Sequence, residues 1–288
     1  MQYRDVIANL VAAGALALAA GCATANDAAP AAVPVVPKLL VAFAAGPITI
    51  DGKLDEKAWA GAMSTGPFVG PINADANSLG GRPDYRTEAK LLWDAKTLYV
   101  AFLCRNPGPF WATYDKHDDK LYEQDVAEVF LDVAGDRLQY AEVQSSPRGV
   151  TFDCYHLWLR QPTYPADKLD WGFGRFHFID FGWNLGGFVA AGAPLLEDGK
   201  EVGWVVEMRV PMAGLLEYRG LPTELRPGQI VYLNLLRYVY VPDPKDPENG
   251  KRQHRHLNWS PTMNGCPHVS PMADLPVQCA PPPVAAGQ

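Results

Sequence analysis

Residues 201–210, EVGWVVEMRV, carry the pattern that decides the fold of this chain. Val206, Met208 and Val210 occupy every second position, so in an extended strand their side chains would lie on one face. The stretch therefore predicts a β-strand that turns one face towards a core.

Segments of this kind recur along the chain. Turn-forming runs such as WDAKT and EDGKE separate them. Helical patterns are confined to two short turns, 55–62 and 211–218, and a proline opens the second. Many strands without alternating helices predict an all-β fold, an antiparallel β-sandwich of jelly-roll type. The other expected strands are 87–93, 97–104, 126–133, 138–146, 149–159, 173–180, 185–193, 229–241 and 256–260.

The N-terminal residues predict export. Arg4 precedes an apolar run, residues 6–21, which Cys22 follows. A run of about 16 residues is shorter than the roughly 20 of a membrane-spanning helix and is typical of a signal peptide. Small residues directly ahead of Cys22 favour a lipoprotein signal, and an ordinary secretory signal with an incidental cysteine is the alternative. We therefore expect a lipoprotein of the bacterial cell envelope, with Cys22 as the lipid-modified residue and only contact with the membrane.

Composition divides the chain into four parts. We expect a signal peptide at 1–21, an Ala/Pro-rich tether at 22–45, a β-sandwich domain at 46–279 and a disordered tail at 280–288. The domain, of about 240 residues, is long enough for one sizeable core. The net charge of −7 and the pI near 5.4 argue against nucleic acid as a partner, because phosphate binding needs clustered Lys and Arg.

Cysteine usage predicts disulfides. Apart from Cys22, the chain has Cys104, Cys154, Cys266 and Cys279, an even number for an oxidising compartment. Four cysteines allow three pairings, and we favour Cys104 with Cys154 and Cys266 with Cys279. A metal cluster is the poorer interpretation, because no two of them have C-x-x-C spacing.

Several phrases, in order, resemble family 9 carbohydrate-binding modules. ITIDGKLDEKAW (48–59) is similar to the opening of these modules, and YEQDVAEVFLD, VGWVVEMRVPMAGL and NWSPTMNGCPHVSPMADLPV continue the likeness. The resemblance, which extends to the wider DOMON-like group, implies a β-sandwich. It also implies binding of sugar-chain ends between two aromatic side chains, and structural calcium.

The site of this family maps onto the chain only in part. Tyr122 stands where the sugar binders have a stacking tryptophan, and Glu128 matches the acid of the following strand. Glu142 and Gln144 stand where the family has a basic residue and an amide. His268 lies near the position of the second tryptophan. The resemblance therefore implies a platform of Tyr and His, with a different ligand or a weakened site.

Two further side chains could join this site. Arg237 follows an apolar strand run and could project towards the sugar-binding face or pair with Glu142. Trp111, in a loop, could contact ligand or pack against the protein. We expect Asp125 to orient the loop beside Tyr122 without touching ligand.

Two charged segments have simpler interpretations. His254 and His256 lie in KRQHRH, which we expect to be a solvated loop, with a metal site as the less favoured alternative. DKHDD (115–119) offers enough oxygen atoms for calcium, but we favour a solvated acidic loop.

Three functions follow from these observations. The first is non-catalytic binding of a poly- or oligosaccharide, with sugars stacked on aromatic rings and hydrogen-bonded to carboxylates and amides. The second is glycoside hydrolysis by Glu128 and Glu142 as paired carboxylates. The third is a haem- or redox-associated domain with Met208, Met212 or His268 as axial ligand.

Overall fold

A computed structural model describes residues 39–71, 78–160, 175–243, 245, 251–260 and 275–283. The strands are β1 (Leu39–Phe43), β2 (Thr87–Trp93), β3 (Thr97–Arg105), β4 (Val126–Asp132), β5 (Gln139–Ser145), β6 (Thr151–Arg160), β7 (Arg175–Asp180), β8 (Val189–Glu197), β9 (Lys200–Pro211), β10 (Ile230–Pro242), β11 (Arg252–Asn258) and β12 (Leu275–Cys279). Two short helices, α2 (Lys57–Gly61) and α3 (Ala213–Tyr218), confirm the predicted helical turns. Single 3-10 turns are η1 (Pro83–Tyr85) and η2 (Leu121–Glu123).

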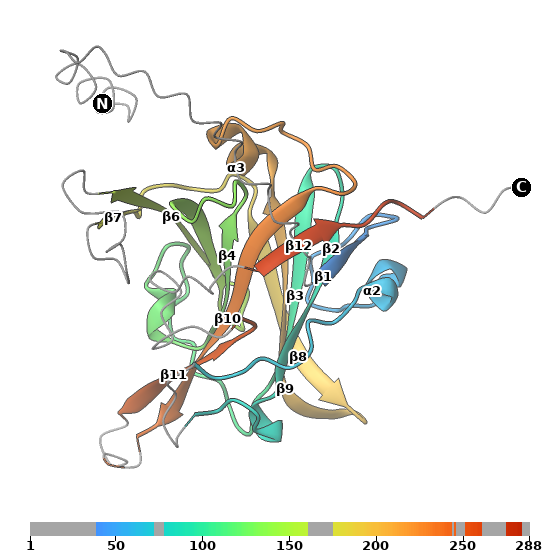
Figure 1. Cartoon of the computed structure of the whole chain (residues 1–288). Helices are drawn as coiled ribbons and strands as arrows, with labels where there is room; N and C mark the ends of the chain where they lie inside the picture. Colours follow the sequence, from blue (N-terminus) through green and yellow to red (C-terminus); the bar gives the residue numbers. More distant parts are fainter. Residues whose placement is uncertain are drawn as a thin grey trace, which may run out of the picture. The chain divides into compact units, whose positions relative to one another are not determined.

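The described strands form one curled sheet. Its order is β7-β6-β5-β4-β10-β12-β1-β2-β3-β9-β8, and β11 pairs with the free end of β10. We call β7, β6, β5, β4, β10 and β12 the first sheet, and β2, β3, β9 and β8 the second sheet. Figure 1 shows the two sheets packed face to face, with β1 and β12 crossing between them at one edge. The predicted all-β sandwich is confirmed.

The pairing is mixed at one place. β1 lies parallel to both β12 and β2, whereas the other ladders are antiparallel. The predicted tether, 22–45, is therefore wrong at its C-terminal end, because Leu39–Phe43 is the strand that joins the two sheets. The predicted tail also begins inside the fold, since Ala280 N–H donates to the Val41 carbonyl at 2.8 Å. Short apolar strands flanked by Ala and Pro are hard to separate from a linker by composition.

The main core lies between the sheets. Alternate residues of each strand supply it, including Val129 on β4 and Leu233 on β10 from the first sheet, and Val206 and Met208 on β9 from the second. The alternation that predicted β9 is thus confirmed. The opposite residues of each strand lie on the outer faces of the sandwich.

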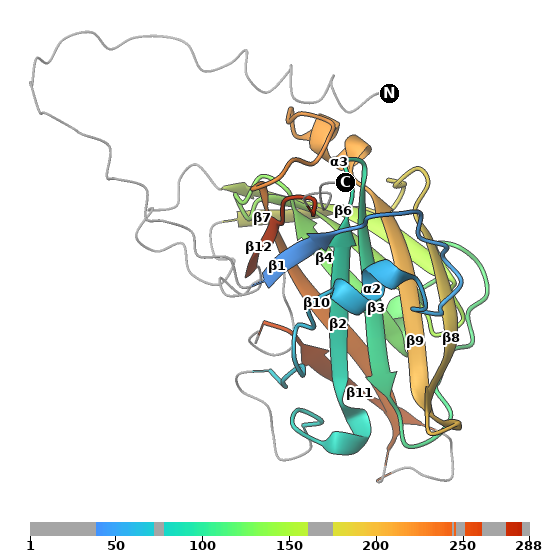
Figure 2. The same ribbon diagram turned by 90° about the vertical axis from the view of Figure 1, so that its right-hand side faces the viewer.

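The outer face of the second sheet is covered by the ITIDGKLDEKAW segment. Figure 2 shows α2 lying across this face. Glu207, buried on β9, accepts hydrogen bonds from the N–H groups of Asp51 and Gly52, both at 3.1 Å, and from Trp59 Nε1 at 3.0 Å. Gly52 has a φ of 82° and packs against Ala193, where a Cβ would clash. This motif is therefore a structural clamp that closes one side of the sandwich.

The predicted disulfide between Cys104 and Cys154 is wrong. Both thiols are free and buried. Cys104, on β3, faces the core between the sheets, whereas Cys154, on β6, faces the outer surface of the first sheet. The first sheet separates them. Cys279 is buried on β12, and its predicted partner Cys266 lies outside the described residues, as does Cys22.

Among the described residues, no helix is long and apolar enough to cross a membrane.

Candidate functional site

The outer face of the first sheet holds a cavity of about 570 Å³. β5 and β6 form its floor, and η2, the end of β7 and the β10–β11 pair form its walls. The lining residues are Tyr122, Glu123, Glu142, Phe152, Cys154, His156, Ile179, Phe181, Tyr238, Tyr240 and His254. The volume is in the range of small-molecule sites, and the lining is mostly aromatic with a few polar groups. We call it the outer-face cavity.

Aromatic rings form its walls. Tyr122 is half-buried and meets Phe152 edge-on, with 6.0 Å between ring centroids. Phe181, more than half exposed, lies 6.4 Å from Phe152. The Tyr240 hydroxyl donates to the Tyr122 carbonyl at 2.8 Å and so fixes η2 against β10. Partly exposed ring faces at a cavity are what the apolar side of a sugar would stack on.

A carboxylate network forms the floor. Gln144 Nε2 donates to Glu142 Oε1 at 2.6 Å and to Glu128 Oε1 at 2.5 Å. Burial, and next the Glu142 charge, raise the pKa of Glu128 well above its ordinary value. The protonated form of Glu128 is thus favoured by its surroundings, and Glu142 is the carboxyl group of the two that reaches the cavity.

Two histidines continue this network. His156 Nε2 lies 2.8 Å from Glu142 Oε2, and His156 Nδ1 lies 2.9 Å from His177 Nε2. His177 stacks on Trp158 at 4.0 Å with the rings almost parallel. Burial, with His156 as the next cause, lowers the pKa of His177 to about 4. The His177 ring is therefore neutral at physiological pH.

A second pair of histidines lies at the β11 wall. His254 and His256 alternate along β11 and pair with Tyr240 and Tyr238 on β10. The prediction of a solvated loop is wrong here, because the KRQHRH segment forms most of this strand. Burial lowers the pKa of His254 to about 4 and that of His256 to about 3. Both rings are neutral aromatic surface at neutral pH.

Comparisons with known proteins bear on this geometry. A family model described as "Carbohydrate family 9 binding domain-like" matches residues 50–148. The resemblance read from the sequence is confirmed. Residues 50–148 therefore match that family model, and we refer to the β-sandwich as the family 9-like domain.

Solved structures share the fold of this family 9-like domain. A family 9 carbohydrate-binding module from Caldicellulosiruptor kristjanssonii, solved with cellotriose, is 17% identical with a TM-score of 0.50, and the match covers 87% of this chain and 97% of that one. A candidate carbohydrate-binding protein from Bacteroides uniformis is 14% identical with a TM-score of 0.51, over 84% and 97% of the two chains. No curated protein matches.

Four predicted site residues of the family 9-like domain gather on the outer face of the first sheet. Tyr122 and Glu142 line the cavity. Glu128 and Gln144 are fully buried behind Glu142, so they hold its carboxylate and do not themselves line the cavity. This also counts against Glu128 and Glu142 as paired catalysts, because both would have to reach a glycosidic bond. His268 lies outside the described residues.

The predicted place of Arg237 is wrong. Its side chain is 0% exposed and points between the two sheets, away from Glu142. Its guanidinium donates to Thr87 Oγ1 at 3.0 Å, to the Arg105 carbonyl at 2.7 Å and to Asn106 Oδ1 at 2.8 Å. On β10, the odd-numbered residues from 231 to 239 face the core, so Arg237 faces the core as well.

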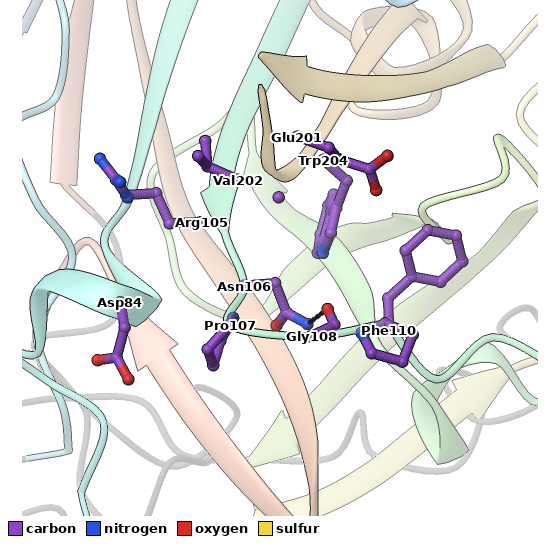
Figure 3. A pocket seen from close by; sticks show the side chains of 11 residues that line it. Asp84, Arg105, Asn106, Pro107, Gly108, Phe110, Glu201, Val202 and Trp204 are labelled. Atoms are coloured by element: carbon purple, nitrogen blue, oxygen red, sulfur yellow. Dashed lines mark hydrogen bonds between the residues drawn. The ribbon is translucent and has the colours of Figure 1, made fainter. Parts of the chain in front are cut away.

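A second cavity, of about 480 Å³, lies beside these Arg237 contacts. Figure 3 shows it between the Arg105–Phe110 segment and the start of β9, with Asn106 hydrogen-bonded to the Gly108 carbonyl. Trp204 lines it but is only 1% exposed, so it offers no ring face for stacking. The outer-face cavity is the better candidate site.

Trp111 does not line the outer-face cavity. The Arg252 guanidinium lies over its ring, 4.3 Å from the centroid. Asp125 accepts from the Trp111 N–H at 2.7 Å and the Tyr240 N–H at 2.6 Å, so its predicted role in orienting the loop is confirmed.

The redox hypothesis loses two of its ligand candidates. Met208 and Met212 are fully buried in the core between the sheets, where their side chains pack against other apolar residues. They are packing residues.

The DKHDD segment is a poor match for the calcium implied by the family. Its His117 and Asp118 approach Asp153. His117 Nε2 bonds Asn184 Oδ1 at 2.9 Å and lies 3.4 Å from Asp118, and Asp153 Oδ1 already accepts from the Leu185 N–H. An imidazole thus stands among the oxygen atoms that calcium would need.

Several cavity residues were missed from the sequence. Phe152 and His156 alternate with Cys154 on β6, and Tyr238 and Tyr240 alternate on β10. Their periodicity was visible in the predicted strands. The sequence does not show which outer face of the sandwich stays uncovered, because that depends on where the loops and β11 lie.

Proposed function

We propose that the family 9-like domain binds a neutral oligosaccharide in the outer-face cavity without chemical conversion. The observation that carries the proposal is the combination of exposed aromatic walls with a buried, hydrogen-bonded carboxylate at the floor. The C–H faces of a sugar bury apolar area against rings, and its hydroxyls donate to a charged acceptor. Tyr122 supplies a ring and Glu142 the acceptor.

The charge of the cavity supports a neutral sugar over an acidic one. Glu123 and Glu142 line it, and none of its described lining residues is Lys or Arg. The lowered pKa of His254, caused chiefly by burial, keeps that ring uncharged at neutral pH. A uronic acid would bring its carboxylate against two others without a cation to offset the repulsion.

The comparisons support the same ligand class. The Caldicellulosiruptor module was solved with cellotriose, and the matching family model is one of carbohydrate binding. In this chain Tyr122 would take the place of a stacking tryptophan, so less ring area is available and we expect weaker binding than two tryptophans would give.

A glycan array followed by calorimetry tests the proposal. We expect the purified chain to bind one or more neutral oligosaccharides, with cellotriose as the first probe. We expect trigalacturonic acid to bind at least about tenfold more weakly, equivalent to about 1.4 kcal/mol. A protein that binds no neutral oligosaccharide, or that prefers the acidic one, would contradict the proposal.

We also propose that Cys22 anchors the domain to the cell envelope through a lipid. The apolar run ahead of Cys22 and the small residues beside it support this. Replacing Cys22 with Ser should move the protein from the membrane fraction to the soluble fraction. An unmutated protein already found in the soluble fraction, cleaved at another residue, would contradict the anchor and leave the sugar proposal untouched.

A further inference from the structure

Three different donor atoms converge on the floor of the outer-face cavity. Cys154 Sγ lies 3.3 Å from His156 Nε2 and 3.7 Å from Glu142 Oε2, and the last two atoms are 2.8 Å apart. Cys154 and His156 come from alternate positions of β6, and Glu142 comes from the paired position on β5. The β-sheet register thus holds one sulfur, one nitrogen and one oxygen atom in a compact triangle.

We propose that Glu142, Cys154 and His156 bind one divalent transition-metal ion of the zinc class. Tetrahedral zinc bound by ligands at about 2.0–2.3 Å separates its donor atoms by roughly 3.3–3.7 Å. Two sides of the triangle match this range, and the His156–Glu142 side, at 2.8 Å, is shorter. A thiolate and an imidazole select zinc-like ions, whereas calcium and magnesium take oxygen ligands. All three residues line the cavity, so a fourth position would face it.

The surroundings orient these donors as they would for a metal site. His177 holds His156 through Nδ1 at 2.9 Å, which leaves Nε2 directed at the triangle. Gln144 Nε2 holds the outer oxygen of Glu142, Oε1, at 2.6 Å, so Oε2 is the atom turned towards Cys154. Such outer hydrogen bonds fix the ring and carboxylate of metal ligands and affect affinity by about 10- to 100-fold.

A bound metal ion would displace the thiol proton of Cys154, because the thiolate is the ligand.

This inference uses the same cavity and the same Glu142 as the proposed function but does not rest on it, and the test omits sugar. The purified, reduced and chelator-treated protein is titrated with Co²⁺ as a spectroscopic substitute for Zn²⁺. We expect one ion per chain, visible bands of a tetrahedral site and a near-ultraviolet sulfur-to-cobalt charge-transfer band. Zn²⁺ should then displace Co²⁺ and remove these bands.

Variants locate the ion. Cys154→Ser should abolish the charge-transfer band, and His156→Gln should weaken binding at least about tenfold. His177→Gln, outside the triangle, should weaken it by about 10- to 100-fold. Cys279→Ser is the matched control, since Cys279 is also a free, buried thiol but lies on β12, away from the cavity.

Two outcomes would overturn the proposal. One is the absence of stoichiometric Co²⁺ binding to the folded, reduced protein. The other is Co²⁺ binding that shows no sulfur-to-cobalt band and that is lost in His117→Gln. That result would assign the ion to the His117, Asp118 and Asp153 group. Near-ultraviolet circular dichroism of each variant separates loss of the ion from loss of the fold.

Discussion

Glu207 and Glu142 occupy similar places on the two outer faces of the sandwich, yet their surroundings differ. Each is buried on a strand away from the main core. Glu207 accepts from three N–H groups of one covering segment, at 3.0–3.1 Å. Glu142 meets side chains that can gain or lose protons, and a cavity lies above it. A buried carboxylate surrounded by N–H donors supports structure, whereas one among titratable side chains beside a cavity is available for binding.

The difference follows from which face the chain covers. The segment that contains α2 closes the second sheet, and its Trp59 packs with Leu92 and Tyr99 in a small outer core. The first sheet instead carries rings and carboxylates under an open cavity. Alternation along the strands gives both sheets an outer face. The covering segment that contains α2 therefore decides which of the two faces can bind ligand.

Removing the Glu207 carboxylate should have the largest effect. In Glu207→Ala the N–H groups of Asp51 and Gly52 and the Trp59 indole would lose their acceptor. Each buried, unsatisfied donor costs about 1–3 kcal/mol, so we expect unfolding free energy to fall by about 3 kcal/mol or more. Urea unfolding measures this. Glu201→Ala, at the exposed start of β9, is the control and should change stability by under about 0.5 kcal/mol.

A Glu207→Ala protein as stable as the wild type would break the comparison. It would mean that the covering segment is held by packing of Trp59 alone and that the carboxylate clamp is incidental.

Removing the Tyr122 ring should have a smaller effect, confined to binding. In Tyr122→Ala we expect a loss of about 1–3 kcal/mol of sugar affinity, if the whole ring face is used. This corresponds to about 5- to 160-fold in Kd by calorimetry. Thermal stability should change little, because Tyr122 is half-buried at the cavity wall and outside the main core.

Tyr122→Phe is the matched variant, because it keeps the ring and removes only the hydroxyl. It should bind the sugar nearly as well as the wild type. If Tyr122→Ala instead unfolds the domain while Glu142→Gln stays folded and binds normally, Tyr122 is a structural residue and the cavity is not the site.

Much of the fold was accessible from sequence because strand alternation is local. Val206, Met208 and Val210 predicted β9, and the two helical turns were found within a few residues. β1 was missed because Leu39–Phe43 follows an Ala/Pro-rich run, and its parallel pairing with β2 and β12 is a long-range contact.

The site was accessible only in part, for a related reason. Tyr122 and Glu142 were found through the family resemblance and line the cavity. Arg237 was assigned to the wrong face, although its alternation with Leu233 and Leu235 in the core shows the correct one. His254 was missed because a charged, histidine-rich run gives no apolar pattern, and only its pairing with β10 makes it part of a wall.

The smallest expected effect concerns Glu128. It sharpens the contrast between a carboxyl group that supports the structure and one that faces the ligand. Burial raises the pKa of Glu128 above its ordinary 4.5, with the Glu142 charge as the next cause. The folded chain therefore keeps a proton that the unfolded chain releases, so this group costs stability as pH rises above about 4.5.

Glu128→Gln mimics the protonated form and can still accept from Gln144. We expect the variant to match the wild type near pH 4 and to be more stable at about pH 7.5, by up to about 1 kcal/mol in urea unfolding. Glu123→Gln, at an exposed position on the same cavity, removes equal charge and should show no such trend. A Glu128→Gln protein that loses stability as pH rises relative to the wild type would mean that Glu128 is ionised in the fold, and that it shares the ligand-facing charge with Glu142.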